Sequence, residues 1–247
     1  QVEISLNHWK GLPVFFEGNP DSDFPFDIFS SSFYLVSRYE EYLDFRPDRH
    51  GRFPAFQSVA FKNGFLNIPV VDLWARELAI ELEKKYPQLA FSLNKYDALL
   101  TIDSDQAFAY LGKGLIRILG GFLKDMISCQ PGKAGKRWRV LIHKENDPFE
   151  VYDYITRKIA RNNTNVKFFF PVGRYSKYDK NPAWKNKRYR SLIKKLGERY
   201  STGLHPSYYA SENVRKFRME RDWLRSILER EILLSRFHFI RMNLLNG

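Results

Sequence analysis

The stretch LLTIDSDQ (residues 99–106) is an apolar run that ends in two carboxylates, Asp103 and Asp105. A short apolar run with β-branched residues predicts a buried strand. Side chains at the carboxyl end of such a strand lie where α/β proteins usually place their chemistry. Because successive strand residues face opposite sides, both carboxylates are expected on one face. One of them could hold a metal ion while the other takes a proton from water; alternatively, both could cap the helix that follows.

Strand and helix patterns alternate downstream of this stretch. The expected order from residue 97 is strand, helix, helix, strand, helix, strand, helix, strand, which predicts a parallel sheet or barrel with right-handed crossovers. Parallel strands would gather at one edge the four polar residues that fall at or near strand ends, which are Asp103, Asp105, His205 and His238. The individual expectations are a helix over 107–127, a basic loop over 130–139, a helix from Asp147, strands over 166–172 and 202–205, a helix over 212–234 and a strand from His238.

Charge divides the chain near residue 96. Residues 1–96 carry 10 Lys and Arg against 13 Asp and Glu, whereas residues 97–247 carry 30 against 15. We therefore expect a small α/β accessory domain over 1–96, with helices over 27–43 and 70–86 and a hairpin over 58–66, and a second domain over 97–247. The basic second half could attract nucleic acid, anionic glycans or a membrane surface.

Composition sets limits on the class of protein. Of the 247 residues, 44% are hydrophobic, so a sizeable core is expected and disorder is not. The single cysteine, Cys129, excludes an internal disulfide framework and a zinc site of several cysteines. No apolar run is long enough to span a bilayer. We expect a cytoplasmic protein, with the periplasm or cell envelope left open because the chain starts at Gln1 rather than at a methionine.

Two motifs and several flanking segments resemble a known family. Asp103-x-Asp105 after an apolar strand, followed downstream by the segment GLHPSY (residues 203–208), resembles the polysaccharide deacetylase family, also called the NodB-homology family. Further segments resemble a bacterial branch of that family in which an accessory domain precedes the deacetylase-like domain; they are residues 32–43, 50–53, 147–149 and 235–241. The resemblance extends over nearly the whole chain.

The resemblance implies a partial, distorted β/α barrel preceded by a small α/β accessory domain. It implies a hydrolase that removes N-acetyl groups from a carbohydrate with the help of a divalent metal, zinc being the first candidate. Asp103 corresponds to the catalytic base, and Asp105 and His205 correspond to metal ligands. The chemistry is coherent, because a bound cation polarises water and the amide carbonyl while a carboxylate accepts the proton. The implied partner is an acetylated carbohydrate, without a membrane span and without nucleic acid.

The sequence departs from the family pattern at the second histidine of the second motif, where Tyr209 stands. His238 is the metal ligand that the expected topology offers instead, and a buried, hydrogen-bonded role is its alternative. Arg236 and Arg241 fall in the region of the third motif, where an arginine commonly orients the base; salt bridges at the surface are the alternative. The later motifs of the family have no counterpart before Gly247, so we expect the deacetylase-like domain to be incomplete.

A second hypothesis is a non-catalytic basic module that binds an anionic polymer, either a glycan or a nucleic acid. Aromatic and basic residues interleave over 184–190 and 216–218. Such patches can neutralise phosphates and stack bases. A solvated helix face is the simpler interpretation of the same residues.

Overall fold

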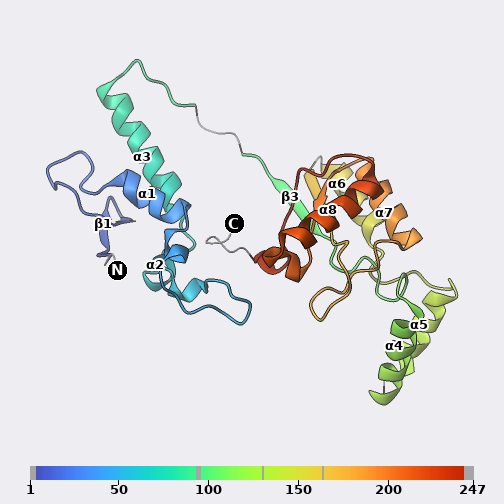
Figure 1. Ribbon diagram of the computed structural model, residues 1–247. Helices are drawn as coiled ribbons and strands as arrows, with labels where there is room; N and C mark the ends of the chain where they lie inside the picture. Colours follow the sequence, from blue (N-terminus) through green and yellow to red (C-terminus); the bar gives the residue numbers. More distant parts are fainter. Residues whose placement is uncertain (1–3, 93–95, 130, 163, 242–247) are drawn as a thin grey trace. The chain divides into compact units, whose positions relative to one another are not determined.

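The computed structural model describes residues 4–92, 96–129, 131–162 and 164–241 (Figure 1). The described residues form two compact units, one ending at Tyr96 and the other beginning at Asp97. This division falls where the net charge of the chain changes sign. Each unit has an apolar core of its own.

The first unit combines one hairpin with several helices. Its elements are β1 (Asn7–Trp9), β2 (Leu12–Val14), α1 (Ile28–Val36), the 3-10 turns η1 (Tyr39–Tyr42) and η2 (Ala55–Gln57), α2 (Val59–Lys62) and α3 (Val70–Lys85). Strands β1 and β2 pair antiparallel, and the tight turn between them requires Gly11, whose φ is +77°. Helix α3 confirms the helix expected over 70–86, and its Trp74 is fully buried against Phe15 and Phe26 at the centre of an aromatic core.

Two expectations for the first unit need correction. The helix expected over 27–43 ends with α1, because Arg38 adopts the left-handed conformation (φ +55°) and the chain continues as η1. The hairpin expected over 58–66 is wrong, since this segment contains helix α2. The hydroxyl of Ser58 caps α2 by accepting a hydrogen bond from a backbone N–H three residues on, and Gly64 (φ +73°) follows its end. The Asn-Gly pair therefore ends a helix here instead of turning a hairpin.

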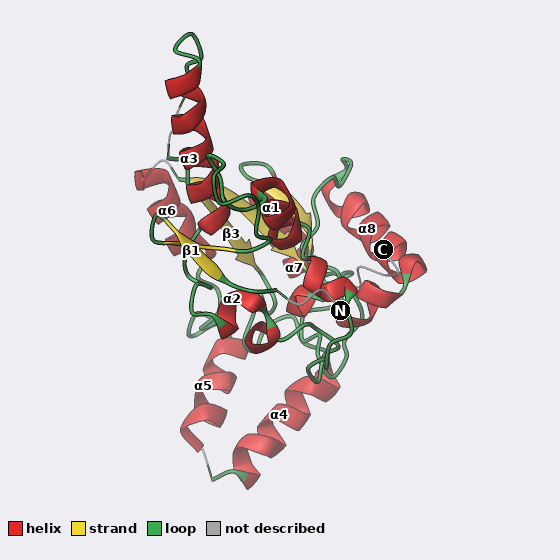
Figure 2. Ribbon diagram, turned by 90° about the vertical axis from the view of Figure 1, so that its left-hand side faces the viewer, coloured by secondary structure: helices red, strands yellow, loops and turns green. Residues whose placement is uncertain are grey.

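The second unit is built on a three-stranded parallel sheet (Figure 2). Its strands are β3 (Leu99–Asp103), β4 (Asn165–Phe170) and β5 (Ser201–Leu204), in the order β3-β4-β5. Its helices are α4 (Leu115–Ile127), α5 (Pro131–Leu141), α6 (Tyr152–Asn162), α7 (Lys187–Gly197), α8 (Val214–Leu228) and the 3-10 turns η3 (Tyr208–Glu212) and η4 (His238–Ile240). The mixed α/β class with a parallel sheet is confirmed, and no closed barrel occurs within the residues described.

Strand β3 is an edge strand of this sheet and not a buried one. Leu99 and Leu100 are 46% and 44% exposed, so the expectation of a buried strand is wrong for its first half. The sheet is buried instead at its centre, where Phe168 and Phe170 of β4 are fully enclosed. Helix α7 covers this part of the sheet with Tyr189, whose ring lies edge-on to Phe170.

Several boundaries in the second unit differ from expectation. The basic segment 130–139 belongs largely to helix α5, because an amphipathic helix can carry many lysines and arginines on its solvent face. The helix expected from Asp147 begins only at Tyr152, and the helix expected over 107–127 begins only at residue 115. The strand expected from His238 is instead turn η4, although the chain just before it forms one parallel bridge between Ser235 and β5. None of the described helices has the length and apolar character needed to cross a membrane.

Candidate metal centre

Asp105 and His205 lie just beyond the carboxyl ends of two strands of the parallel sheet. The ladder continues past β3 and β5: the N–H of Ser104 donates to the carbonyl of Phe169 at 2.9 Å, and the N–H of His205 donates to the carbonyl of Phe170 at 3.0 Å. Both side chains are thereby fixed at the same edge of the sheet, as the sequence predicts.

His238 reaches the same edge from turn η4. The segment before it runs along β5, since the N–H of Leu204 donates to the carbonyl of Leu234 at 2.9 Å and the N–H of Arg236 donates to the carbonyl of Leu204 at 3.0 Å. This close approach requires Gly203, because a Cβ atom there would lie 2.7 Å from the carbonyl oxygen of Leu234. The glycine of the Gly-Leu-His motif therefore lets the segment that carries His238 pack against the strand that carries His205.

Three ligand atoms converge at this edge. The Nε2 atom of His205 lies 3.1 Å from an oxygen of Asp105 and 2.9 Å from Nδ1 of His238, and Nδ1 of His238 lies 3.7 Å from the same oxygen. His205 is 3% exposed, whereas the side chain of Asp105 is 54% exposed, so the cluster is buried on the histidine side and open on the carboxylate side. The three residues named from the sequence thus form a cluster able to hold a metal ion.

Backbone carbonyls orient both imidazole rings. The Nδ1 atom of His205 lies 2.5 Å from the carbonyl oxygen of Arg236, and Nε2 of His238 lies 3.3 Å from the carbonyl oxygen of Tyr178. A carbonyl can only accept a hydrogen bond, so each of these nitrogens carries the ring N–H. In the neutral rings the other nitrogens, Nε2 of His205 and Nδ1 of His238, present lone pairs to each other and to Asp105.

The charge of Asp105 is stabilised within this cluster. When a proton in place of a metal ion occupies Nε2 of His205, its hydrogen bond to Asp105 lowers the pKa of the Asp105 carboxyl below its ordinary value, although burial opposes the shift. The nearby side chains of His205, His238 and Arg236 act electrostatically in the same direction as the hydrogen bond. Asp105 is therefore present as a carboxylate, the form that binds cations.

Asp103 forms an ion pair with Arg236, which also acts electrostatically on Asp105. The Nε atom of Arg236 lies 3.5 Å from one carboxylate oxygen of Asp103, and Nη1 of Arg236 donates to the hydroxyl of Thr101 at 2.5 Å. The other carboxylate oxygen of Asp103 is buried and has no hydrogen-bond partner in the described part of the chain. One oxygen is thus held by a cation while the other remains able to accept a proton.

The second arginine named from the sequence, Arg241, contributes to a different part of the structure. Its guanidinium donates to the carbonyl of Tyr208 at 3.3 Å, pairs with Glu212 and lies 4.3 Å from the centre of the Tyr208 ring. These contacts hold turn η3, which follows the His-Pro-Ser segment. We therefore assign Arg241 a structural role and retain Arg236 as the arginine beside Asp103.

Buried carboxylates support the loop that carries His205. Glu220 of α8 is 2% exposed and accepts hydrogen bonds from the N–H and hydroxyl of Ser207, at 2.8 and 2.5 Å. Asp179 accepts a hydrogen bond from the N–H of Tyr208 at 2.9 Å. Sequence reasoning missed both residues, although Glu220 shares a helix face with the buried apolar side chains of α8, and a carboxylate on such a face signals a buried polar contact.

Asp147 has a similar role in the loop that follows Asp105. Its carboxylate accepts hydrogen bonds from the N–H groups of Ala109, Tyr110, Leu111 and Phe149, at 2.7 to 3.0 Å. Burial alone would raise the pKa of Asp147, but these four donors together lower it. The Asp-Pro-Phe segment is therefore a loop anchor and not a helix start.

A pocket of about 220 Å³ adjoins the metal centre. It is lined by Asp105, Gln106, Pro171, Tyr178, Asp179, Lys180, Asn181, His238 and Phe239. The rings of Tyr178 and Tyr208 stack at 3.9 Å, and Phe239 lies edge-on to Tyr178, so the wall includes packed aromatic rings. Tyr209, which stands where the family has its second histidine, is 44% exposed and packs its ring against Tyr178 and Tyr208.

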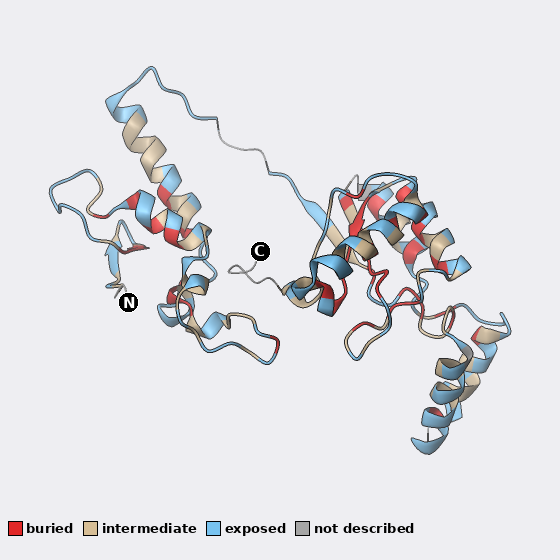
Figure 3. Ribbon diagram, in the orientation of Figure 1, coloured by how far each residue is buried: buried red, intermediate tan, exposed pale blue. Residues whose placement is uncertain are grey.

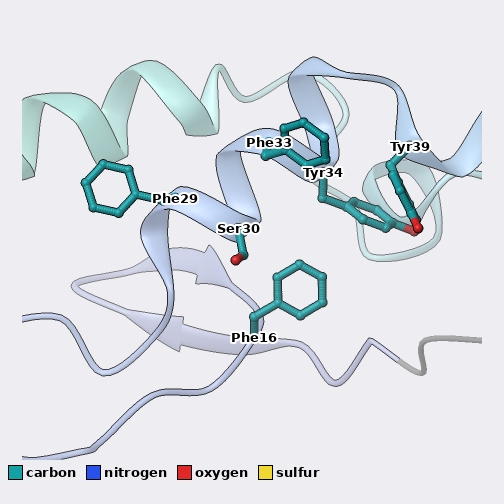
Figure 4. Close-up of a pocket in the computed structure, with 6 residues that line it drawn as sticks. All are labelled: Phe16, Phe29, Ser30, Phe33, Tyr34 and Tyr39. Atoms are coloured by element: carbon teal, nitrogen blue, oxygen red, sulfur yellow. The ribbon is translucent and has the colours of Figure 1, made fainter.

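A larger pocket, of about 610 Å³, lies in the first unit (Figure 4). Its lining residues are Phe16, Phe29, Ser30, Phe33, Tyr34 and Tyr39. Ser30 donates its hydroxyl to the carboxylate of Asp27 at 2.7 Å, and burial raises the pKa of Tyr34 to about 12. The pocket thus has an apolar wall, and burial keeps the hydroxyl of Tyr34 protonated.

The aromatic residues of the proposed polymer-binding patch pack within the second unit. Trp184 stacks on Trp223 at 5.1 Å, Phe217 stacks on Phe237 at 5.7 Å, and Tyr189 is fully buried. Tyr189 is therefore closed to base stacking, and the Trp184 and Phe217 rings each have one face occupied by another aromatic ring.

Comparison with known proteins gives one match. Residues 1–87 match the sequence profile of a family of unknown function, DUF7033. No curated protein and no solved structure matches the chain.

Proposed function

We propose that the second unit is a metal-dependent hydrolase that removes N-acetyl groups from a carbohydrate. The observation that carries the proposal is the convergence of two imidazole lone pairs and one carboxylate oxygen at the carboxyl edge of a parallel sheet. With each ring N–H donated to a carbonyl, the three facing atoms at 2.9 to 3.7 Å are all acceptors, so a proton or a metal ion must lie among them.

The donor set fits a divalent metal such as zinc. Ligands about 2.0–2.1 Å from a tetrahedral zinc ion lie about 3.3 Å from one another. The three separations between Asp105, His205 and His238 lie on either side of this value. Nitrogen and oxygen ligands suit zinc, and the carbonyls behind both rings are the outer partners that metal-binding histidines typically have.

The surrounding residues can carry out amide hydrolysis. A divalent ion held by Asp105, His205 and His238 would supply a Lewis acid toward water and the amide carbonyl. Asp103 would accept the proton of the attacking water as general base. Arg236 would orient Asp103 through its contacts with Asp103 and Thr101.

The fold and the pocket support the carbohydrate assignment. The parallel β3-β4-β5 sheet, with chemistry at its carboxyl ends, is compatible with part of a β/α barrel of the polysaccharide deacetylase type. The pocket beside the centre combines packed aromatic rings with Gln106, Lys180 and Asn181. Apolar ring faces and a few polar groups of this kind suit a sugar substrate.

Acetate release from acetylated amino-sugar oligomers tests the proposal. The chain is stripped with a chelator, reloaded with zinc, cobalt or nickel, and compared with the Asp105→Asn variant. We expect acetate release that depends on the metal and is lost in the variant. Metal binding without acetate release from any oligomer would overturn the hydrolase and leave a metal-binding module.

A further inference from the structure

Helices α4 and α5 form a closely joined pair within the second unit (Figure 1). Arg137 of α5 donates two hydrogen bonds to Asp125 of α4, at 2.9 and 2.8 Å, and both side chains are largely buried. Gly121 gives the guanidinium room, because a Cβ atom there would lie 2.4 Å from Nη1 of Arg137. The Arg137–Asp125 pair therefore joins the two helices, and each of these charged groups has its partner within the pair.

The pair is also anchored to the rest of its unit. Arg117 donates to the carbonyls of Lys180 and Asn181 at 3.0 and 3.3 Å and lies over the ring of Tyr175. Val140, near the end of α5, is fully buried in the core of the unit. The pair is thus tied both to the core and to the loop that lines the pocket of the metal centre.

One face of α4 is apolar and uncovered (Figure 3). Its side chains are between 63% and 88% exposed: Ile116, Leu119, Leu123, Met126 and Ile127. Their spacing along the helix places all five on one side. Trp138 of α5 is 57% exposed as well. A continuous exposed apolar face of this kind marks a binding surface.

The segment that carries this face is rich in basic residues. Residues 113–144 contain eight Lys and Arg, which are Lys113, Arg117, Lys124, Lys133, Lys136, Arg137, Arg139 and Lys144. The same range contains one carboxylate, Asp125, which pairs with Arg137, and Glu145 directly after it pairs with Arg139. The pair therefore offers an apolar face within a strongly cationic segment.

We propose that the α4–α5 pair lies in the interface of a lipid bilayer with anionic headgroups. The apolar side chains of α4 and the indole of Trp138 would enter the boundary between headgroups and acyl chains, while the lysines and arginines bind the headgroups. If a second copy of the chain covered this face, two positively charged segments would lie close together and repel each other. If a nucleic acid bound the basic residues, the apolar face of α4 would remain in water. A lipid surface with anionic headgroups satisfies both the apolar and the charged groups.

Vesicle flotation tests the proposal without any metal or substrate. The whole chain is mixed with vesicles of phosphatidylcholine alone or of phosphatidylcholine with phosphatidylglycerol. We expect binding to the anionic vesicles, weakened by salt, and about a tenfold loss of bound protein in Leu119→Glu/Leu123→Glu. The matched control is Val214→Glu/Leu233→Glu, which changes two exposed apolar residues of the same unit outside the pair and keeps binding within about twofold.

A second readout distinguishes insertion from surface adsorption. Brominated lipid is expected to quench the fluorescence of Trp138. The contribution of Trp138 is measured as the difference in fluorescence between the parent and Trp138→Phe. The proposal is overturned if the parent does not float with anionic vesicles, if both double variants lose binding equally, or if Trp138 is not quenched. Self-association that Leu119→Glu/Leu123→Glu abolishes, without vesicle binding, would show that a second copy covers the face.

Discussion

The aromatic pocket of the first unit is nearly three times as large as the pocket beside the metal centre, about 610 Å³ against about 220 Å³. In the larger pocket the hydroxyl of Ser30 is bonded to Asp27, and burial keeps the hydroxyl of Tyr34 protonated. Beside the smaller pocket, two imidazole nitrogens and a carboxylate oxygen face one another in an arrangement that could hold a metal ion. A fixed arrangement of possible ligand atoms, and not the size of a pocket, is therefore the better guide to a candidate site.

The largest expected effect concerns the proposed base. Asp103→Asn keeps the shape of the side chain but removes the proton acceptor, so acetate release should fall by about 10²–10⁴-fold. Metal content should be unchanged, because Asp103 is not one of the three ligands. The control is Tyr39→Phe in the aromatic pocket, which should keep the parent rate. A rate within about twofold of the parent for Asp103→Asn would exclude its role as base.

The next effect concerns the buried carboxylate behind His205. Glu220→Ala leaves the N–H and hydroxyl of Ser207 without their acceptor, so the free energy of unfolding should fall by about 2–4 kcal/mol. Urea unfolding measures this loss. The exposed Glu231, paired with Arg225 at the surface, is the matched control, and Glu231→Ala should cost less than about 0.5 kcal/mol. Equal losses for the two variants would contradict the assigned role of Glu220.

A smaller effect is expected at the glycine beneath the centre. In Gly203→Ala the new Cβ atom would lie 2.7 Å from the carbonyl oxygen of Leu234, so the free energy of unfolding should fall by about 1–3 kcal/mol. Metal affinity should fall too, because the segment that carries His238 must move away. Gly120→Ala is the control: its Cβ has open space in helix α4, and the change should be neutral or slightly stabilising. Parent-like stability and affinity in Gly203→Ala would mean that the close approach is not required.

The smallest effect is expected in the larger pocket. Phe33 is 64% exposed, so Phe33→Ala should change the free energy of unfolding by no more than about 0.5 kcal/mol. Metal content and acetate release should match those of the parent. A loss of metal in Phe33→Ala would contradict this comparison, because it would show that the aromatic pocket of the first unit affects metal binding.

The sequence predicted the parallel sheet because short apolar runs separated by helical patterns leave few alternatives. It also named Asp105, His205 and His238, since all three follow or adjoin expected strand ends. It did not predict that β3 is an edge strand, because a short apolar run is typical both of edge strands and of central strands. The sequence predicts a loop in the basic segment 130–139, where α5 lies, because a high density of charge occurs both in loops and on solvent-exposed helices.

The supporting residues of the site could be predicted only in part. The roles of Asp147 and Asp179 depend on backbone N–H groups brought to them by distant loops, and no local pattern encodes such contacts. Arg236 and Arg241 are five residues apart in a similar setting, yet one contacts Asp103 and the other contacts Glu212. Turn η4, with left-handed conformations at Phe239 and Ile240, separates them, and the sequence predicted a strand there.

Metal content tests the central claim most directly. The parent, His238→Ala and Tyr209→Phe are each incubated with zinc, dialysed and analysed for bound metal. The cluster of Asp105, His205 and His238 predicts about one zinc per chain in the parent and in Tyr209→Phe, and loss of zinc in His238→Ala. Zinc retained in His238→Ala at the level of the parent, or absent from all three proteins, would contradict the metal centre.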